Sequence, residues 1–391
     1  MIDKKCLILT CEYPPTEGGI ANAAASFAKA LTQRGWKITV CSAESAGEPP
    51  LRETSTGDVH RLQIRGDTSI WNPLSGNIAA FEKILQQLTP DVVVIHGWQS
   101  WYILMLSRIR EAGIPVILQS HGFGYHLVSW NWRPLFGLKF WAGYLPFICE
   151  LPSLIRKLHA FVVLSHKPNA ILSFDHWLGA KSHCQNVITI PNGVEQPRGT
   201  KEEFLSRYPN LTGKTIVLCV ANYCDRKNQL AALHVVQRIE DPDINLVLIG
   251  GEENDYTRQV RKMVESLNLT SRVTVLTAVP RNVTEGAIAA CKVALMTSKF
   301  EMQPLFLLEA MALGKPWVST RVGSVAELAG GIVVGNDINA LATSVATLLT
   351  DASLYATLSE NGFKQWQDEY IPRVVYDQWE RLLLSATSHG Y

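Results

Sequence analysis

Two successive series of short apolar runs, separated by helix-like segments, constrain the fold of this chain more than any other feature. The first series runs from CLILTC (6–11) to NVITIPNG (186–193), and the second from TIVLCV (215–220) to GIVVG (331–335). Nearly continuous apolar strands that alternate with helices are typical of parallel sheets covered by helices on both faces. The sequence therefore predicts an α/β protein with two doubly wound, Rossmann-like domains.

A cluster of Pro, Gly and Asn in IPNGVEQPRG (190–199) marks the expected boundary between the domains. We assign residues 1–195 to the first domain and 196–370 to the second, because 391 residues are enough for two. The last segment, 371–391, begins with a helical pattern outside the rhythm of the second sheet. We expect this C-terminal helix to pack back across the boundary onto the first domain.

Composition and charge exclude several classes of protein. Apolar residues make up 47% of the chain and charged residues 18%, as in ordinary globular proteins, and the net charge of +1 predicts no nucleic-acid partner. The eight Cys show no ligand or disulfide spacing, which predicts no structural metal and favours a reducing compartment. The N-terminus lacks a signal-peptide pattern, and the longest apolar stretch, 134–148, is too short to span a membrane. We therefore expect a cytoplasmic protein.

In open parallel sheets, ligands bind at the carboxyl ends of the strands, and polar candidates lie there in the first series. Gly18 and Gly19 open the first helix, whose unpaired N–H groups favour a phosphate, with an ordinary glycine turn as the alternative. His121 follows a later strand and can hydrogen-bond a substrate hydroxyl, unless it is a satisfied structural histidine. His96 occupies the neighbouring strand end and competes with His121 for that role.

Charged residues follow two strands of the second series. Arg226 and Lys227 can neutralise a diphosphate, whereas the simpler alternative is a pair of solvated charges at a helix start. Glu301 ends a loop, and Glu309 lies in the apolar stripe of a short helix expected to begin near Pro304. An ionised carboxylate among apolar neighbours is costly unless it is hydrogen-bonded. A backbone amide, a lysine, or the hydroxyls of a sugar or ribose must therefore satisfy Glu309.

Together these motifs resemble the retaining glycosyltransferases of family 4, which have the GT-B fold. The resemblance covers nearly the whole chain, and its most specific part is the Glu301–Glu309 spacing with LEAMALGKP (308–316). The other matching motifs, in the same order as in the family, are YPPTEGGI (13–20), SHG (120–122), IPNGV (190–194) and KN (227–228). The resemblance implies two Rossmann-like domains that face a shared cleft.

By this resemblance, Glu309 binds the ribose of a nucleotide, and Glu301 contacts hydroxyls of the donor sugar. Lys227 binds the diphosphate, and His121 lies near the donor sugar and the reaction centre. The Gly18-Gly19 loop approaches the phosphate. His121, Glu301 and Lys227 are thus the expected catalytic residues.

The chain departs from the family pattern at two places in the expected donor site. The position five residues before the Lys carries Asn222 where many members have Arg, and Arg226 is the candidate to compensate for that missing cation. The segment after the first Glu is Met302-Gln303-Pro304 where many members have Gly-Phe-Gly, and Pro304 has no N–H to offer a donor. We still expect Asn222, Gln303, Pro304 and Leu305 to line the donor site.

The resemblance implies transfer of a sugar from a nucleotide diphospho-sugar to an acceptor hydroxyl with retention of configuration, without metal or other cofactor. Surface polysaccharide or glycolipid assembly is the expected setting. The alternatives are a non-catalytic protein that binds nucleotide sugars and a nucleotide-sugar epimerase.

The acceptor is expected to be a glycan or a lipid-linked molecule. Residues 128–160 are basic and rich in aromatic side chains, a composition that suits peripheral contact with the inner face of a membrane. A helical hairpin whose aromatic side chains pack in the core is the other interpretation of this segment.

Overall fold

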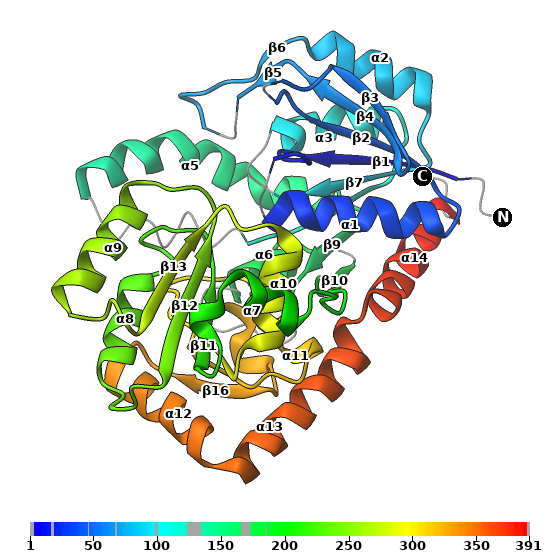
Figure 1. The fold of residues 1–391 in the computed structure, drawn as a ribbon. Helices are drawn as coiled ribbons and strands as arrows, with labels where there is room; N and C mark the ends of the chain where they lie inside the picture. Colours follow the sequence, from blue (N-terminus) through cyan, green and yellow to red (C-terminus); the bar gives the residue numbers. More distant parts are fainter. Residues whose placement is uncertain are drawn as a thin grey trace. The chain divides into compact units, whose positions relative to one another are not determined.

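A computed structural model describes residues 4–16, 19–45, 47–66, 69–97, 101–122, 134–165, 173–184 and 186–388 (Figure 1). The chain divides into two compact units. Unit 1 comprises Met1–Gly193 and Pro372–Tyr391, and unit 2 comprises Val194–Ile371. Unit 1 therefore contains both the beginning and the end of the chain.

The sheet of unit 1 has eight strands in the order β10-β9-β8-β7-β1-β2-β4-β3. All neighbouring pairs are parallel except β3 and β4, which form an antiparallel edge pair. The edge strand β3 was not predicted, because its residues are exposed and carry no apolar run. The strands are β1 (Lys5–Thr10), β2 (Lys37–Ala43), β3 (Leu51–Thr54), β4 (Gly57–Leu62), β7 (Val92–His96), β8 (Val116–Gln119), β9 (Ala160–Val163) and β10 (Val187–Thr189). A separate two-stranded sheet pairs β5 (Ile64–Arg65) with β6 (Ser75–Gly76).

Helices cover both faces of this sheet. One apolar cluster contains α1 and α14, and the other contains α2, η1, α3, α5 and α6. The helical segments are α1 (Gly19–Gln33), α2 (Ile78–Leu88), η1 (Trp101–Met105), α3 (Leu106–Glu111), α5 (Pro134–Arg156), α6 (Ser173–Lys181) and α14 (Pro372–Ser388).

Helix α1 buries Ala21, Ala24, Phe27, Ala28 and Leu31, at the three- and four-residue spacing of a single apolar stripe. The C-terminal helix α14 lies beside α1 (Figure 1). Burial of this shared apolar surface is the main favourable contribution to the packing of the two helices.

The sheet of unit 2 has six parallel strands in the order β13-β12-β11-β14-β15-β16. The strands are β11 (Thr215–Val220), β12 (Ile244–Gly250), β13 (Val273–Thr277), β14 (Val293–Met296), β15 (Trp317–Thr320) and β16 (Gly331–Val334). The order reverses between β11 and β14, which is the topological switch point where ligands bind in doubly wound sheets. The predicted α/β class with two doubly wound sheets is confirmed.

The helices of unit 2 also cover both faces of its sheet. Apolar side chains of α7, α10 and α11 pack on one face, and those of α8, α9 and α12 on the other. The helical segments are α7 (Lys201–Arg207), η3 (Pro209–Leu211), α8 (Gln229–Gln237), α9 (Asp255–Ser266), α10 (Arg281–Ala290), α11 (Leu305–Ala312), η4 (Gly323–Glu327), α12 (Ile338–Thr350), α13 (Ala352–Gln365) and η5 (Trp366–Tyr370).

Candidate functional site

A lysine and a glutamate meet at the switch point of unit 2. Lys227 lies in the loop between β11 and α8, Glu301 lies between β14 and α11, and the Lys227 ammonium forms an ion pair with Oε1 of Glu301. The hydroxyl of Ser298 donates a hydrogen bond of 2.8 Å to the same carboxylate oxygen. Thr297 Oγ1 donates to the carbonyl of Asn228 at 2.9 Å, which ties the two loops together. The structure thus brings together two residues that are 74 positions apart.

The segment after Glu301 is in close contact with a turn that contains Gly323. Gly323 has a left-handed φ of +52°, and a Cβ built on it would lie 2.3 Å from the carbonyl oxygen of Met302. The backbone N–H of Ser324 donates to that oxygen at 2.8 Å. Gln303 and Pro304 are buried. The non-glycine loop is therefore fixed by backbone contacts that only a glycine at position 323 permits.

Glu309 lies on α11, which begins at Leu305 with Pro304 as its N-cap residue, so the predicted start is confirmed to within one residue. The predicted single apolar stripe is too narrow, because every residue from Phe306 to Ala312 is buried and only Leu305 is partly exposed. This helix is enclosed by its surroundings, and Glu309 is only 8% exposed.

Arg281 is the partner that satisfies Glu309. Its Nη2 lies 2.6 Å from Oε1 of Glu309, and its Nε lies 2.9 Å from Oε1 of Glu285. Burial raises the pKa of Glu309, and the neighbouring Arg281 guanidinium opposes that rise. The partners expected from the sequence were a backbone amide, a lysine or a ligand hydroxyl, and this arginine was not among them. The available signal was its place at the start of α10, a few residues after the carboxyl end of β13.

In unit 1, the two rival histidines lie in contact. His96 is the last residue of β7, His121 follows β8, and Nδ1 of His96 lies 3.2 Å from Nε2 of His121. Burial lowers the pKa of His121 to about 4. Burial and the neighbouring His121 hold the pKa of His96 well below its usual value. The two histidines therefore form one hydrogen-bonded pair at the carboxyl ends of β7 and β8.

Of the other residues predicted to bind the donor, the structure describes Gly19, Asn222 and Arg226 but not Gly18. Gly18 lies outside the described residues. Gly19 is the first residue of α1, is exposed and has open space where a Cβ would project. Asn222 and Arg226 are exposed in the loop after β11 that also contains Lys227.

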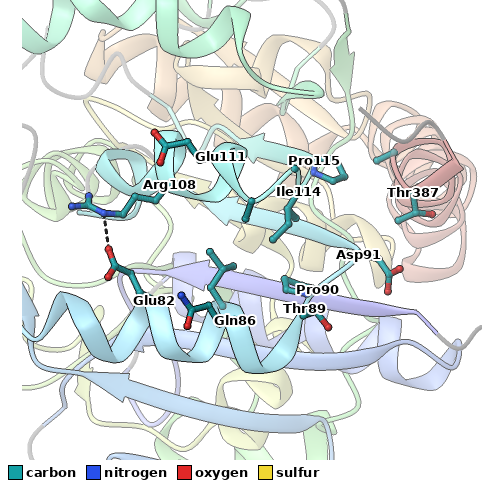
Figure 2. A pocket seen from close by; sticks show the side chains of 14 residues that line it. Glu82, Gln86, Thr89, Pro90, Asp91, Arg108, Glu111, Ile114, Pro115 and Thr387 are labelled. Atoms are coloured by element: carbon teal, nitrogen blue, oxygen red, sulfur yellow. Dashed lines mark hydrogen bonds and ion pairs between the residues drawn. The ribbon is translucent and has the colours of Figure 1, made fainter.

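A cavity of about 560 Å³ lies at the other edge of the unit 1 sheet (Figure 2). Its lining includes Asp91 and Pro115, which precede β7 and β8, and the Glu82–Arg108 ion pair of 2.8 Å. At about 3.3 Å per residue, β7 separates Asp91 from His96 by roughly 16 Å. The cavity therefore does not include the two histidines.

Among the residues that the structure describes, no group of three or more His, Cys, Asp or Glu side chains gathers where it could hold a metal ion. None of the helices described is both long and apolar enough to cross a membrane.

Comparisons with known proteins agree on one class. Residues 200–365 match the family model described as glycosyl transferases group 1, and residues 18–179 match that of the glycosyl transferase 4-like domain. The GDP-mannose-dependent alpha-(1-6)-phosphatidylinositol monomannoside mannosyltransferase of Mycolicibacterium smegmatis is 22% identical over 382 residues, which cover 92% of this chain and 93% of that protein.

Solved structures share the architecture at low sequence identity. Sucrose-phosphate synthase from Thermosynechococcus elongatus superposes with a TM-score of 0.78 at 18% identity, over 98% of this chain and 100% of that one. Anabaena HepE in complex with UDP gives a TM-score of 0.75 at 17% identity, over 97% and 100% of the two chains. The fold and the charged switch point thus define a glycosyltransferase of the GT-B fold. The chain belongs to the group 1 glycosyltransferases, family 4.

Proposed function

We propose that this enzyme transfers a hexosyl or related sugar from a nucleotide diphospho-sugar to an acceptor hydroxyl, with retention of the anomeric configuration. The observation that carries the proposal is the shared pattern of the two glutamates in unit 2. In each, Oε1 is bound by a cation, Lys227 for Glu301 and Arg281 for Glu309. Within the described residues, Oε2 of each carboxylate has no protein partner and remains able to accept a hydrogen bond from a ligand hydroxyl.

The proposed donor lies along the carboxyl edge of the unit 2 sheet. Glu309 on α11 accepts hydrogen bonds from the ribose, and Glu301 accepts them from the sugar. Lys227 exchanges its ion pair with Glu301 for contact with the diphosphate, with the exposed Arg226 beside it. Arg226 thereby supplies the positive charge that is missing at position 222, where this chain has Asn222. Gln303, Pro304 and Leu305 line the donor site next to Glu301.

In the proposed reaction, the leaving diphosphate and the incoming acceptor hydroxyl occupy the same face of the sugar. The bond between C1 and the diphosphate oxygen breaks, and a bond between C1 and the acceptor oxygen forms on that same face. The departing diphosphate oxygen accepts the proton of the acceptor hydroxyl. Lys227 and the N-terminus of α1, which includes Gly19, stabilise the negative charge that develops on the diphosphate. His121 donates a hydrogen bond at the reaction centre.

The proposal requires no metal, because cationic side chains and helix N–H groups neutralise the leaving group. Transfer is accordingly expected to proceed unchanged in EDTA. A loss of turnover in EDTA that Mg²⁺ or Mn²⁺ restores would contradict this part of the proposal.

The function is tested first by finding the donor. A thermal-shift screen with UDP-, GDP-, ADP- and dTDP-sugars should show a rise in apparent stability with one of them, because ligand binding stabilises the folded state. Glu309→Ala should then weaken that donor's affinity in calorimetry. Glu253→Ala is the control, because Glu253 is a more exposed glutamate of the same unit that also pairs with an arginine, Arg261. Unchanged affinity in Glu309→Ala would refute the ribose role.

Product analysis tests the stereochemistry and the reaction type. We expect a glycosylated acceptor with the donor's anomeric configuration and a free nucleoside diphosphate. An inverted product would overturn the retaining mechanism, and an epimerised donor without acceptor would indicate an epimerase. Donor binding with neither transfer nor slow hydrolysis would indicate a non-catalytic protein.

We propose a lipid-linked acceptor and a cytoplasmic enzyme at the inner face of the membrane. The support from known proteins is the lipid acceptor named for the mycobacterial relative. Part of the segment 128–160, residues 128–133, lies outside the described residues. The remainder contains one continuous helix, α5, and not the helical hairpin of the second interpretation. Phe147, Leu151 and Ile155 of α5 pack in the core.

Apolar side chains also remain exposed beside α5. Leu145 is 55% exposed, Trp71 is 58% exposed, and the N–H of Ile70 donates to the carbonyl of Gly143 on α5 at 2.9 Å. A Trp beside exposed aliphatic side chains suits a membrane interface. Sedimentation with vesicles containing anionic lipid should show binding that Trp71→Ala weakens. Trp177→Ala changes a Trp of α6 that is 52% exposed, and it should leave vesicle binding unchanged. Equal behaviour of the two variants would contradict the proposal.

A further inference from the structure

The ring of His96 contacts two other aromatic rings. The edge-to-face contact with Phe27 of α1 has a centroid distance of 5.0 Å and an interplanar angle of 68°. The ring of His121 is nearly parallel to that of His96, with a centroid distance of 5.5 Å and an interplanar angle of 21°. The N–H of Gly97 donates to the carbonyl of Gln119 at 3.0 Å and ties the two strand ends together. The orientation of His96 relative to His121 is therefore fixed by packing.

A single hydrogen bond joins the two imidazoles. It runs between Nδ1 of His96 and Nε2 of His121, 3.2 Å apart. The remaining nitrogen of His96, Nε2, is buried and has no hydrogen-bond partner among the residues that the structure describes. The remaining nitrogen of His121, Nδ1, has no protein partner in those ranges either, and His121 keeps part of its surface exposed.

The proton in this hydrogen bond has two arrangements. If His121 donates from Nε2, then neutral His96 must carry its proton on Nε2, where a buried N–H has no acceptor among the described residues. If His96 donates from Nδ1, then its buried Nε2 is only an unfilled lone pair. Unpaired buried N–H groups are rarer in proteins than under-used acceptors, because an unmade hydrogen bond from a buried donor is costly. The second arrangement is therefore the more stable one.

We infer that His96 is a positioning residue that donates from Nδ1 to Nε2 of His121 and thereby holds the proton of His121 on Nδ1. His121 then presents an N–H, and not a basic nitrogen, from the only position that the pair leaves open. Its substrate partner would be an acceptor atom, such as a hydroxyl oxygen of the donor sugar. This consequence for catalysis rests on the proposed function, whereas the proton arrangement does not.

Both rings are neutral near pH 7. Burial lowers the pKa of His121 to about 4, and burial together with His121 lowers that of His96 further below its usual value. A charged ring at either position would donate from both nitrogens and remove the distinction between the two tautomers.

Nitrogen NMR of the ligand-free protein with ¹⁵N-labelled histidine tests the inference directly. The shifts of protonated and unprotonated ring nitrogens are distinct, so each tautomer has its own signature. We expect His121 to carry its proton on Nδ1 and to keep Nε2 unprotonated. A proton on Nε2 of His121, or an equal mixture of both tautomers, would overturn the inference.

Two variants of His96 separate positioning from packing. His96→Asn keeps an amide N–H close to the place of Nδ1 and should keep the Nδ1–H tautomer of His121. His96→Phe keeps the flat ring but removes the donor, and the tautomer preference of His121 should be lost. A preserved preference in His96→Phe would contradict the inference. If wild-type His121 shows the Nδ1–H form while His121→Asn transfers sugar normally, the inference holds and the proposed role of His121 in transfer fails.

Discussion

The guanidinium of Arg281 lies 2.6 Å from Oε1 of Glu309 and so satisfies a carboxylate in an otherwise apolar helix. Arg281 is the first residue of α10, where the helix dipole disfavours a cation. Glu285, one turn along α10, and Glu309 compensate for that unfavourable position. The arginine also leaves one oxygen of Glu309 for a ligand. Arg281 thus serves the stability of α11 and the proposed ribose site together.

Arg281→Ala is expected to weaken both stability and donor binding. Glu309 would stay buried without its cation, so its pKa should rise further and its charged form should become less favourable. Because Arg281 is 59% exposed, we expect a loss of only about 1 kcal/mol in the free energy of unfolding. Urea denaturation and calorimetry with GDP-mannose and UDP-glucose measure the two effects.

The matched control for that variant is Arg258→Ala. Arg258 is equally exposed, at 59%, and pairs with Asp255 on the surface of α9. Its removal should leave stability and donor affinity near those of the wild type. Equal losses in the two variants would show that the Arg281–Glu309 pair has no special role.

Lys227→Met is expected to lower turnover about a hundredfold, because it removes the cation that we propose stabilises the leaving diphosphate. Methionine keeps much of the apolar stem of the lysine, so the fold should persist. Lys299→Met is the control, since Lys299 lies in the adjoining loop and its ammonium is 2.6 Å from Asp225. Steady-state turnover at saturating donor measures the effect, and a wild-type rate in Lys227→Met would exclude the diphosphate role.

Gly323→Ala should disturb the loop that contains Glu301. The added Cβ would meet the carbonyl oxygens of Met302 at 2.3 Å and of Glu301 at 2.6 Å, in addition to the left-handed strain at φ +52°. We expect a loss of about 1–3 kcal/mol in stability and a lower turnover. Gly213→Ala is matched in having φ of +80° but meets no atom within 4 Å, so its loss should be smaller. Urea denaturation ranks the two, and the reverse order would contradict the loop contact.

The lowered pKa values of His96 and His121 predict a stability that falls in acid. Their pKa values are lowered in the folded state, so below about pH 6.5 the unfolded chain binds more protons and unfolding becomes easier. With a folded pKa of about 4, His121 alone accounts for about 2 kcal/mol between pH 7 and pH 5. This contribution is fully present above the unfolded pKa and is lost as the pH falls.

Hydrogen exchange of the β7 and β8 amides at pH values from 7 to 5 measures this dependence within unit 1. The double variant His96→Asn/His121→Asn lacks both titrating groups and should show a clearly smaller change in the free energy of opening. Identical pH dependence in the wild type and the double variant would show that the histidines do not titrate as described.

The chain's own periodicity was enough to predict the architecture. An apolar run is a local signal that can be recognised along the chain without knowledge of the fold. It located β11 and β14, and it placed Lys227 and Glu301 after strand ends. The same reasoning placed His96 and His121 at neighbouring ends and α11 at its observed start. It missed β3, whose exposed residues carry no apolar signal, because that strand is defined by its pairing with β4.

Tertiary structure decided which of these side chains meet. Lys227 and Glu301 are in contact because β14 hydrogen-bonds to β11, a pairing between distant strands that local periodicity does not encode. The ion pair of Glu309 with Arg281 depends on the packing of unit 2. The contacts of His96 with His121 and Phe27 depend in the same way on the packing of unit 1. The sequence by itself thus determined where the polar residues lie along each strand and helix. The partners, the exposure and the protonation of those residues depend on neighbours that are distant along the chain, and so only the folded structure decides them.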